Sequence, residues 1–212
     1  MQRIATSFHR SARIGRSLMR DGSGLAAVEF AIILPLMLVM FFGTVEFSSG
    51  IAVDRKVTLV ARTLSDLVSQ TDKSVDDNAV KNAFAASSSV LTPFDVAPVR
   101  PTISEIYIDA NKIAKIQWTK SATVAMSSGS PQVTLQVSAH NVGDVVTIPP
   151  TLLIAQTFLI WSEVDYRYTP AVGYVMGKTG VNLHDESYTR PRYSSCVDYP
   201  APASQANACT PK

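Results

Sequence analysis

One apolar stretch, residues 24–47, constrains what this chain can fold into more than any other feature. It reads GLAAVEFAIILPLMLVMFFGTVEF, and its only charged side chains are those of Glu29 and Glu46. A helix over residues 25–47 would rise about 34 Å, enough to cross a hydrocarbon core of about 30 Å. Pro35 is compatible with such a helix, because neighbouring helices can satisfy the freed backbone carbonyl in a membrane. We therefore predict one membrane-spanning helix.

Basic residues before the span predict its orientation. Residues 1–24 contain five arginines and one acid, so they carry a formal charge of +4 and leave −2 for the remainder of the chain. This asymmetry favours a cytoplasmic N-terminus and an exported C-terminal part. Basic residues also follow the span, but acids are interspersed with them: Arg55, Lys56 and Arg62 with Asp54 and Asp66. An exported part with a charge of −2 has no basic footprint for nucleic acid.

The small residues near the span argue against an ordinary secretory signal, in which a small-x-small cleavage site follows the apolar core. Here Gly22, Ser23 and Gly24 come before the apolar stretch. A cut at that point would leave the hydrophobic helix on the mature protein.

The run from Gly24 to Phe30, GLAAVEF, resembles the processing site of class III prepilins. In that site a dedicated peptidase cuts after a glycine, and glutamate and an aromatic residue follow at the fifth and sixth mature positions. In a chain that starts at Leu25, these are Glu29 and Phe30. The whole chain resembles the TadE-like minor pseudopilins of the tight-adherence (Tad/Flp, type IVc) pilus system. The distal runs SEVDYRYTPAVGYVMG (162–177) and SYTRPRYSS (187–195) share this resemblance.

The resemblance implies a function, partners and a location. It implies a minor pilin or pseudopilin that is needed to assemble the pilus and supports adherence and biofilm formation. Its partners would be the membrane, the prepilin peptidase, other pilins and pseudopilins and the assembly platform, in a homo- or hetero-oligomer. It would cross the bacterial inner membrane once, with its C-terminal domain in the periplasm and, after assembly, at the cell surface.

Glu29 has a physical reason to be functional that does not depend on the resemblance. A carboxylate inside an apolar helix costs about 2.5–3.5 kcal/mol on insertion scales, so such a residue usually has a partner. Cleavage after Gly24 would create an α-amino group on Leu25. Glu29 of a neighbouring subunit could pair with it in a medium where charge pairs are strong. The alternative is that Glu29 only marks the cytoplasmic end of an ordinary anchor.

The helix is predicted to continue beyond the span as an amphipathic stem over residues 48–70. Apolar residues recur at alternating spacings of four and three, which places them on one stripe: Val53, Val57, Val60, Leu64 and Leu67. A short coiled coil between anchored subunits is the alternative for this half. The predicted division is a leader at 1–24 (the prepilin peptide), a transmembrane helix at 25–47, the stem at 48–70 and an exported domain at 71–212.

The exported domain is predicted to be α+β, with an antiparallel sheet of about five strands against the long helix. A second helix begins after Ser74 as N-cap and runs to about Ala86, before a proline-containing linker that ends at Pro101. Strand-like runs occupy 103–109, 112–119, 133–139, 145–149 and 157–168, with one helical turn at 152–156. Residues 119–131 and the chain from 177 onward are predicted to be loops.

Two cysteines, Cys196 and Cys209, lie in the predicted exported tail. An even count in an oxidising compartment favours one disulfide, worth up to about 3 kcal/mol in the chain-entropy model. Two free thiols are the alternative. Two cysteines alone cannot form a zinc site.

The sequence lacks a convincing catalytic constellation, so we expect no enzyme, cofactor or metal. The run 177–179 (GKT) resembles a phosphate-binding loop, but position 172, where that motif needs glycine, is valine. Three adjacent residues, His184, Asp185 and Glu186, diverge around the chain and favour a solvated loop over a metal site. His140 lies near a turn with no evident nucleophile beside it.

Two other functions stay open. An uncleaved signal-anchored envelope protein could bind another envelope component through its exported domain, and retention of residues 1–24 would favour it. An exported module could bind polysaccharide or surface ligands through Trp118, Trp161 and the tyrosine-rich tail. The sequence supplies no physical role for Arg190 or Arg192. It also does not say whether the protein enters the filament, caps its tip or only primes assembly.

Overall fold

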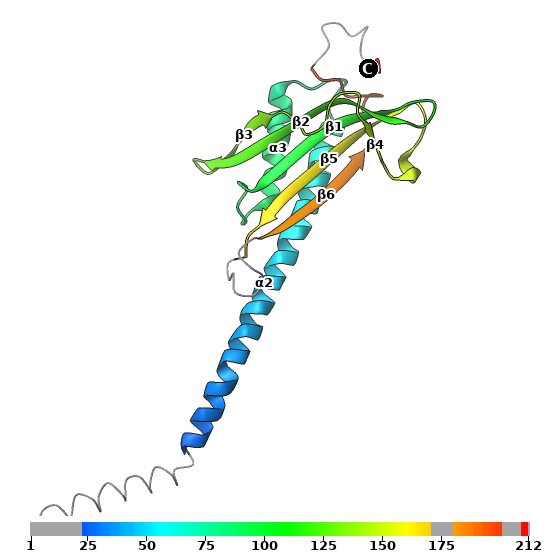
Figure 1. Ribbon diagram of the computed structural model, residues 1–212. Helices are drawn as coiled ribbons and strands as arrows, with labels where there is room; N and C mark the ends of the chain where they lie inside the picture. The colour runs from blue at the N-terminus through cyan, green and yellow to red at the C-terminus, as the bar shows by residue number, and fades with distance from the viewer. Residues whose placement is uncertain (1–22, 171–179, 201–208, 212) are drawn as a thin grey trace, which may run out of the picture. The chain divides into compact units, whose positions relative to one another are not determined.

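The computed structural model describes residues 23–170, 180–200 and 209–211 (Figure 1). The predicted leader, apart from its last two residues, and the GKT run at 177–179 lie outside the described residues. The chain separates into two compact units, Met1–Phe47 and Ser48–Lys212, which are described separately.

A single helix, α2 (Ser23–Ser69), contains the predicted span and the predicted stem. Pro35 lies inside it, and the helix continues through Gly43 and Gly50. The prediction of a long N-terminal apolar helix followed by an antiparallel sheet domain is confirmed. Residues 24–42 are exposed throughout.

In the second unit, one face of α2 is buried against the sheet. This face carries Val53, Val57, Val60, Leu64 and Val68, each at most 1% exposed. Val68 takes the place in the stripe that the sequence analysis assigned to Leu67, which is only half-buried. Because the stripe packs inside its own domain, it is not available for the coiled coil with a neighbouring subunit that was the alternative for this half.

The second helix, α3 (Asp77–Ser88), is capped by Asp76, whose Oδ1 accepts a hydrogen bond from the Ala79 amide at 2.7 Å. The prediction of Ser74 as N-cap was wrong. Ser74 instead forms a parallel bridge with Asp198 of the tail, two residues before the cap. A short 3-10 helix, η1 (Ser89–Leu91), follows α3 directly.

The sheet is antiparallel and has the strand order β3-β2-β1-β5-β6, with β4 paired to the other end of β2 (Figure 1). Its strands are β1 (Val99–Ile108), β2 (Ala114–Ser127), β3 (Ser130–Gln136), β4 (Val145–Val146), β5 (Thr157–Tyr168) and β6 (Val181–Thr189). A second 3-10 helix, η2 (Pro150–Leu152), replaces the turn predicted at 152–156. The bounds of β5 are those predicted.

Two segments predicted as loops are strands. The first, residues 119–131, belongs mostly to β2, which continues to Ser127 and turns back through Ser128 and Gly129. Its small residues alternate between faces, and Ala122 and Val124 are buried. The linker prediction was also too long, because β1 begins at Val99 and includes Pro101.

The second missed strand is β6, which pairs along β5 from Tyr168 to Ile160. Its inward residues bond to hydroxyl groups on α2: Asp185 to Thr58, and Ser187 and Thr189 both to Ser65 at 3.0 Å. Since these inward positions are polar, β6 has no apolar alternation in its sequence. Gly180 directly precedes β6 and has a φ of +73, and a Cβ added there would lie 2.7 Å from the Tyr168 carbonyl oxygen.

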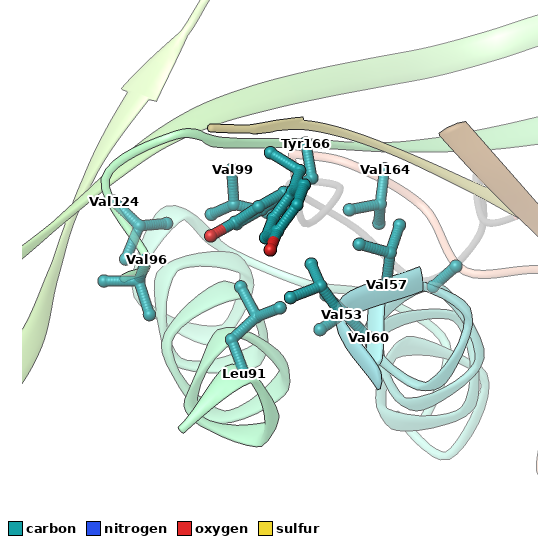
Figure 2. Close-up of a cluster of buried hydrophobic side chains, with 11 residues drawn as sticks. Val53, Val57, Val60, Leu91, Val96, Val99, Val124, Val164 and Tyr166 are labelled. Carbon is teal, nitrogen blue, oxygen red and sulfur yellow. The ribbon is translucent and has the colours of Figure 1, made fainter. Parts of the chain in front are cut away.

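The core between α2 and the sheet is continuous across β1, β2 and β5. Figure 2 shows one part, in which valines of α2 and Leu91 of η1 meet Val99, Val124, Val164 and Tyr166 of the sheet. The adjoining part contains Phe84 of α3, Ile103, Trp118 and Ile160. Each such side chain stabilises the fold by about 1.5–3 kcal/mol through burial.

The opposite face of the sheet is apolar at one end only. There Ile106, Ile116, Leu159 and Trp161 pack with Ile148 and the η2 segment. The rest of this face carries polar and charged side chains.

Candidate functional site

The apolar part of α2 is the first candidate functional feature. By length and composition, the helix Gly24–Ser69 can cross a membrane, and none of its most apolar window is buried. It is the one helix of this kind among the residues that the structure describes. Leu25, Ile32, Leu36 and Met40 are each more than 60% exposed. This surface belongs in lipid or against other apolar helices.

The four predicted processing residues lie in the first two turns of α2. Gly24, Leu25, Glu29 and Phe30 are all exposed. Leu25 and Glu29 are four positions apart, so they lie on the same face of the helix. The structure therefore presents the predicted cleavage sequence on an uncovered surface.

Gly24 itself has no structural reason to be glycine. Its φ is not positive, and an added Cβ would have nothing within 4 Å. Alanine would favour a helix at this position by about 0.8–1 kcal/mol. The fold therefore places no requirement for glycine on this position.

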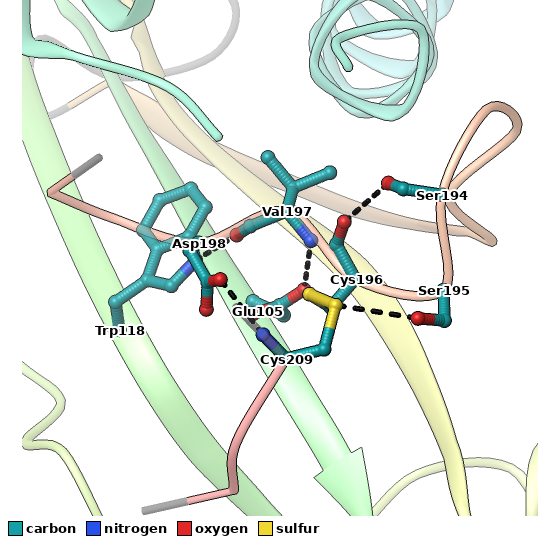
Figure 3. The surroundings of a disulfide bond; sticks show 8 residues. All are labelled: Glu105, Trp118, Ser194, Ser195, Cys196, Val197, Asp198 and Cys209. Atoms are coloured by element: carbon teal, nitrogen blue, oxygen red, sulfur yellow. Dashed lines mark hydrogen bonds between the residues drawn. A yellow bond between two sulfur atoms is a disulfide. The ribbon is translucent and has the colours of Figure 1, made fainter. Parts of the chain in front are cut away.

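The tail after β6 forms a second feature, which we call the tail clamp and define as residues 192–200 with Cys209. Cys196 and Cys209 are joined by a disulfide with a Cα–Cα distance of 5.5 Å (Figure 3). Val197 donates its amide to Glu105 Oε1 at 2.6 Å, and its carbonyl accepts from Trp118 Nε1 at 2.6 Å. Both bonds are buried, so the tail is fixed to the central strands β1 and β2.

The tail clamp also holds the junction between α2 and α3. Asp198 accepts from the Val75 amide at 2.9 Å and donates its own amide to the Lys73 carbonyl at 2.8 Å. The Cys209 amide donates to Asp198 Oδ2 at 2.8 Å, so the disulfide and this junction share one residue. The clamp therefore connects the end of α2, the start of α3 and the sheet.

Arg192 has a role in the clamp that sequence reasoning missed. Its amide donates to the Ser69 carbonyl at 2.9 Å, at the last residue of α2, and its guanidinium pairs with Asp66 one turn earlier. A cation at a helix C-terminus is stabilised by the helix dipole. The sequence showed the charge of Asp66 and the approximate end of the long helix. It did not show that Arg192 pairs with both. Nothing in the structure explains Arg190.

Trp118 and Trp161 are buried, at 3% and 6% exposure, so the structure does not present either ring on the surface for the ligand binding that was the third alternative. Trp118 Nε1 is used by the tail, and Trp161 Nε1 donates to Glu186 Oε2 at 3.1 Å. His184 and Glu186 lie on one face of β6 and Asp185 on the other, on a strand and not in the predicted loop. They do not gather into one ligand set.

His140, which had no partner in the sequence analysis, contacts Glu163 of β5. The distance from His140 Nε2 to Glu163 Oε2 is 2.8 Å. These two residues are far apart in the chain, and only the crossing of residues 137–141 over the sheet brings them together.

These features define a class of protein. It is a membrane-anchored protein whose N-terminal apolar helix continues into an α+β domain that contains a disulfide. The family model described as TadE-like protein matches residues 24–65. The match begins at the predicted cleavage glycine and covers the apolar helix and most of the stem. It confirms the resemblance over these residues and supports a TadE-like protein associated with the Tad pilus, while the distal runs 162–177 and 187–195 lie outside the match. No curated protein and no solved structure matches the chain.

Proposed function

We propose that the chain is a minor pilin or pseudopilin that a prepilin peptidase cuts after Gly24 and that takes part in assembling a Tad-type pilus. The observation that carries the proposal is the match to the TadE-like family from residue 24, on a helix whose first turns are fully exposed. The peptidase and the other pilins and pseudopilins are its proposed partners. Adherence and biofilm formation are the proposed outcomes.

In this proposal the protein acts by packing and has no catalytic activity. The apolar helix holds the subunit in the inner membrane, with the N-terminus in the cytoplasm and the domain in the periplasm. It then moves into a bundle of similar helices, where Glu29 pairs with the α-amino group of a neighbouring subunit. An oxidising periplasm suits the disulfide of the tail clamp.

The test is the N-terminal sequence of the protein recovered from membranes of a strain with its native secretion system. The proposal expects the chain to start at Leu25. A start at Met1 would contradict it and would favour the uncleaved signal anchor, whose domain binds another envelope component.

A further inference from the structure

The polar face of the sheet is crossed by a short segment that we call the strap, residues 137–141. It connects β3 to β4 and is anchored beyond its end, where the Gly143 amide donates to the Ile116 carbonyl at 2.8 Å. Open cavities of about 370 Å³ lie on both sides of the strap, and Val137 and His140 line both. Val137 is 95% exposed. The strap therefore stands above the sheet with little packing beneath its backbone.

His140 joins the strap to strand β5 through two contacts. Its Nε2 lies 2.8 Å from Glu163 Oε2, and its ring lies 5.0 Å from the Trp161 ring. Trp161 is in turn stacked on Tyr188 of β6 at 6.0 Å. The His140 side chain thus lies between the strap and an aromatic pair on the sheet.

Glu163 is surrounded by titratable groups from every element near it. Asp165 follows on β5, Glu186 is its cross-strand partner on β6, His184 is the next outward residue there, and Arg100 lies opposite Asp165 on β1. Burial raises the pKa of Glu163, while the nearby His140 and His184 lower it and Asp165 raises it. The net effect is a raised pKa, so Glu163 takes up a proton at milder acidity than an exposed carboxyl group.

We propose that the His140–Glu163 contact is an acid-sensitive fastening of the strap, and that protonation of Glu163 releases the strap from the sheet. Protonation of Glu163 removes the carboxylate charge that holds the half-buried His140 ring beside Trp161. A half-buried polar side chain that loses its charged partner is unfavourable, and lifting the strap returns the His140 side chain to solvent. Release uncovers the Trp161 face and the groove beneath, which is lined by Arg100, Thr102, Ser121 and Thr123.

This device is independent of the proposed pilin function, because it lies wholly within residues 100–188 of the domain. The proton balance is simple: one proton is taken up by Glu163 on release and returned on closure.

The test uses the full-length protein in detergent micelles between pH 7 and pH 4. Hydrogen–deuterium exchange of peptides covering 137–141, corrected for intrinsic pH dependence, is expected to accelerate in mild acid. The far-UV circular dichroism should stay unchanged over that range, and the turn at Ser128–Gly129 serves as an internal reference. In a Trp118→Phe background, the emission of Trp161 should shift to longer wavelength and acrylamide quenching should increase at the same pH.

Two variants separate the fastening from general acid effects. Glu163→Gln removes the carboxylate charge at every pH and so mimics the protonated state. Strap exchange should therefore be fast already at pH 7 and should not accelerate further between pH 7 and pH 4. His184→Asn is the matched control on the same face. It should keep the response and move its midpoint to higher pH, because a nearby positive charge that lowers the pKa of Glu163 is lost.

Three results would overturn the proposal. They are a strap whose exchange is the same at pH 7 and pH 4 in the wild type, a full response that persists in Glu163→Gln, and a response that appears only together with global unfolding. If Trp118→Phe does not fold, the exchange experiment on the wild type and Glu163→Gln decides alone.

Discussion

At the scale of single residues, Gly24 and Glu29 carry the functional proposal, and neither is explained by the fold. Gly24 has a helical backbone and open space around its Cα. Glu29 is an exposed carboxylate among apolar side chains. Neither residue stabilises the helix, and the helix would form without them. We therefore explain both by recognition of this segment by another molecule.

Substituting Gly24 by alanine or valine is expected to block maturation without harming the fold. Alanine gains about 0.8–1 kcal/mol of helix propensity, and no atom lies close enough to clash. The measurement is the size shift of the membrane protein on a gel, with the N-terminal sequence as confirmation. Gly50→Ala, a glycine in the same helix with ordinary room for a Cβ, is the control and should mature normally. A full size shift in Gly24→Ala and in Gly24→Val would refute the assigned site.

Substituting Glu29 by alanine or glutamine is expected to leave the protein in the membrane and to impair pilus assembly. Both changes remove a charge that costs about 2.5–3.5 kcal/mol in the apolar phase, so insertion is not weakened. What is lost is the pairing with a neighbour's α-amino group. Piliation is counted by electron microscopy, with Glu29→Asp as a variant that keeps the charge. Normal pilus numbers in Glu29→Gln would contradict the pairing role.

At the scale of elements, the tail clamp and strand β6 are the parts that sequence patterns describe least well. Both are built from polar contacts between distant segments. The clamp uses Glu105 and Trp118 of the sheet, while β6 uses Thr58 and Ser65 of α2. From the sequence alone, a polar residue is expected to face solvent. Only the folded structure shows which partner it bonds to inside the domain.

Replacing both cysteines by serine is expected to lower the free energy of unfolding of the domain by up to about 3 kcal/mol. The disulfide closes a segment of sequence separation 13, and Cys196 is fully buried, so its loss also loosens the bonds of Val197. Urea unfolding followed by tryptophan fluorescence measures the change, since Trp118, one of the two tryptophans, bonds through Nε1 to the Val197 carbonyl. Arg190→Ala, which changes a neighbouring exposed residue, is the control and should stay within about 0.5 kcal/mol of wild type. An unchanged unfolding curve for the double serine variant would show that the clamp holds without its disulfide.

At the scale of the whole molecule, the domain contains all the core that the structure describes. Its three buried clusters start at Val53 and include no residue of the first unit. The apolar part of α2 therefore supports a membrane anchor, and the domain's own stability comes from burial of the α2 stripe against the sheet.

A fragment of residues 48–212 is consequently expected to be monomeric in water without detergent and to unfold cooperatively. Far-UV circular dichroism should show mixed helix and strand, and thermal unfolding should follow a single transition. The full-length chain, which keeps the exposed apolar helix, should need detergent under the same conditions. A fragment that aggregates or lacks cooperative unfolding would show that residues before Ser48 contribute to the fold of the domain.

Much of this protein was determined by its sequence alone. The apolar helix, the continuation of that helix, the antiparallel α+β domain and the bounds of β5 follow from apolar composition and periodicity, whereas the predicted processing residues come from the resemblance to class III prepilins. Periodicity is a local property, because each position is judged against its near neighbours in the chain. Glu29 was visible as a charged exception within an apolar run, while Gly24 was singled out by the resemblance to a prepilin processing site.

The tertiary structure alone decided where the polar residues go. It turned His184–Glu186 from a loop into a strand, gave Arg192 a partner in Asp66, buried Trp118 and Trp161, and brought His140 to Glu163. These outcomes depend on hydrogen bonds and charges between residues at least 19 positions apart. The two partners of such a contact meet only when the chain has folded. A pattern of neighbouring residues in the sequence therefore does not predict the contact.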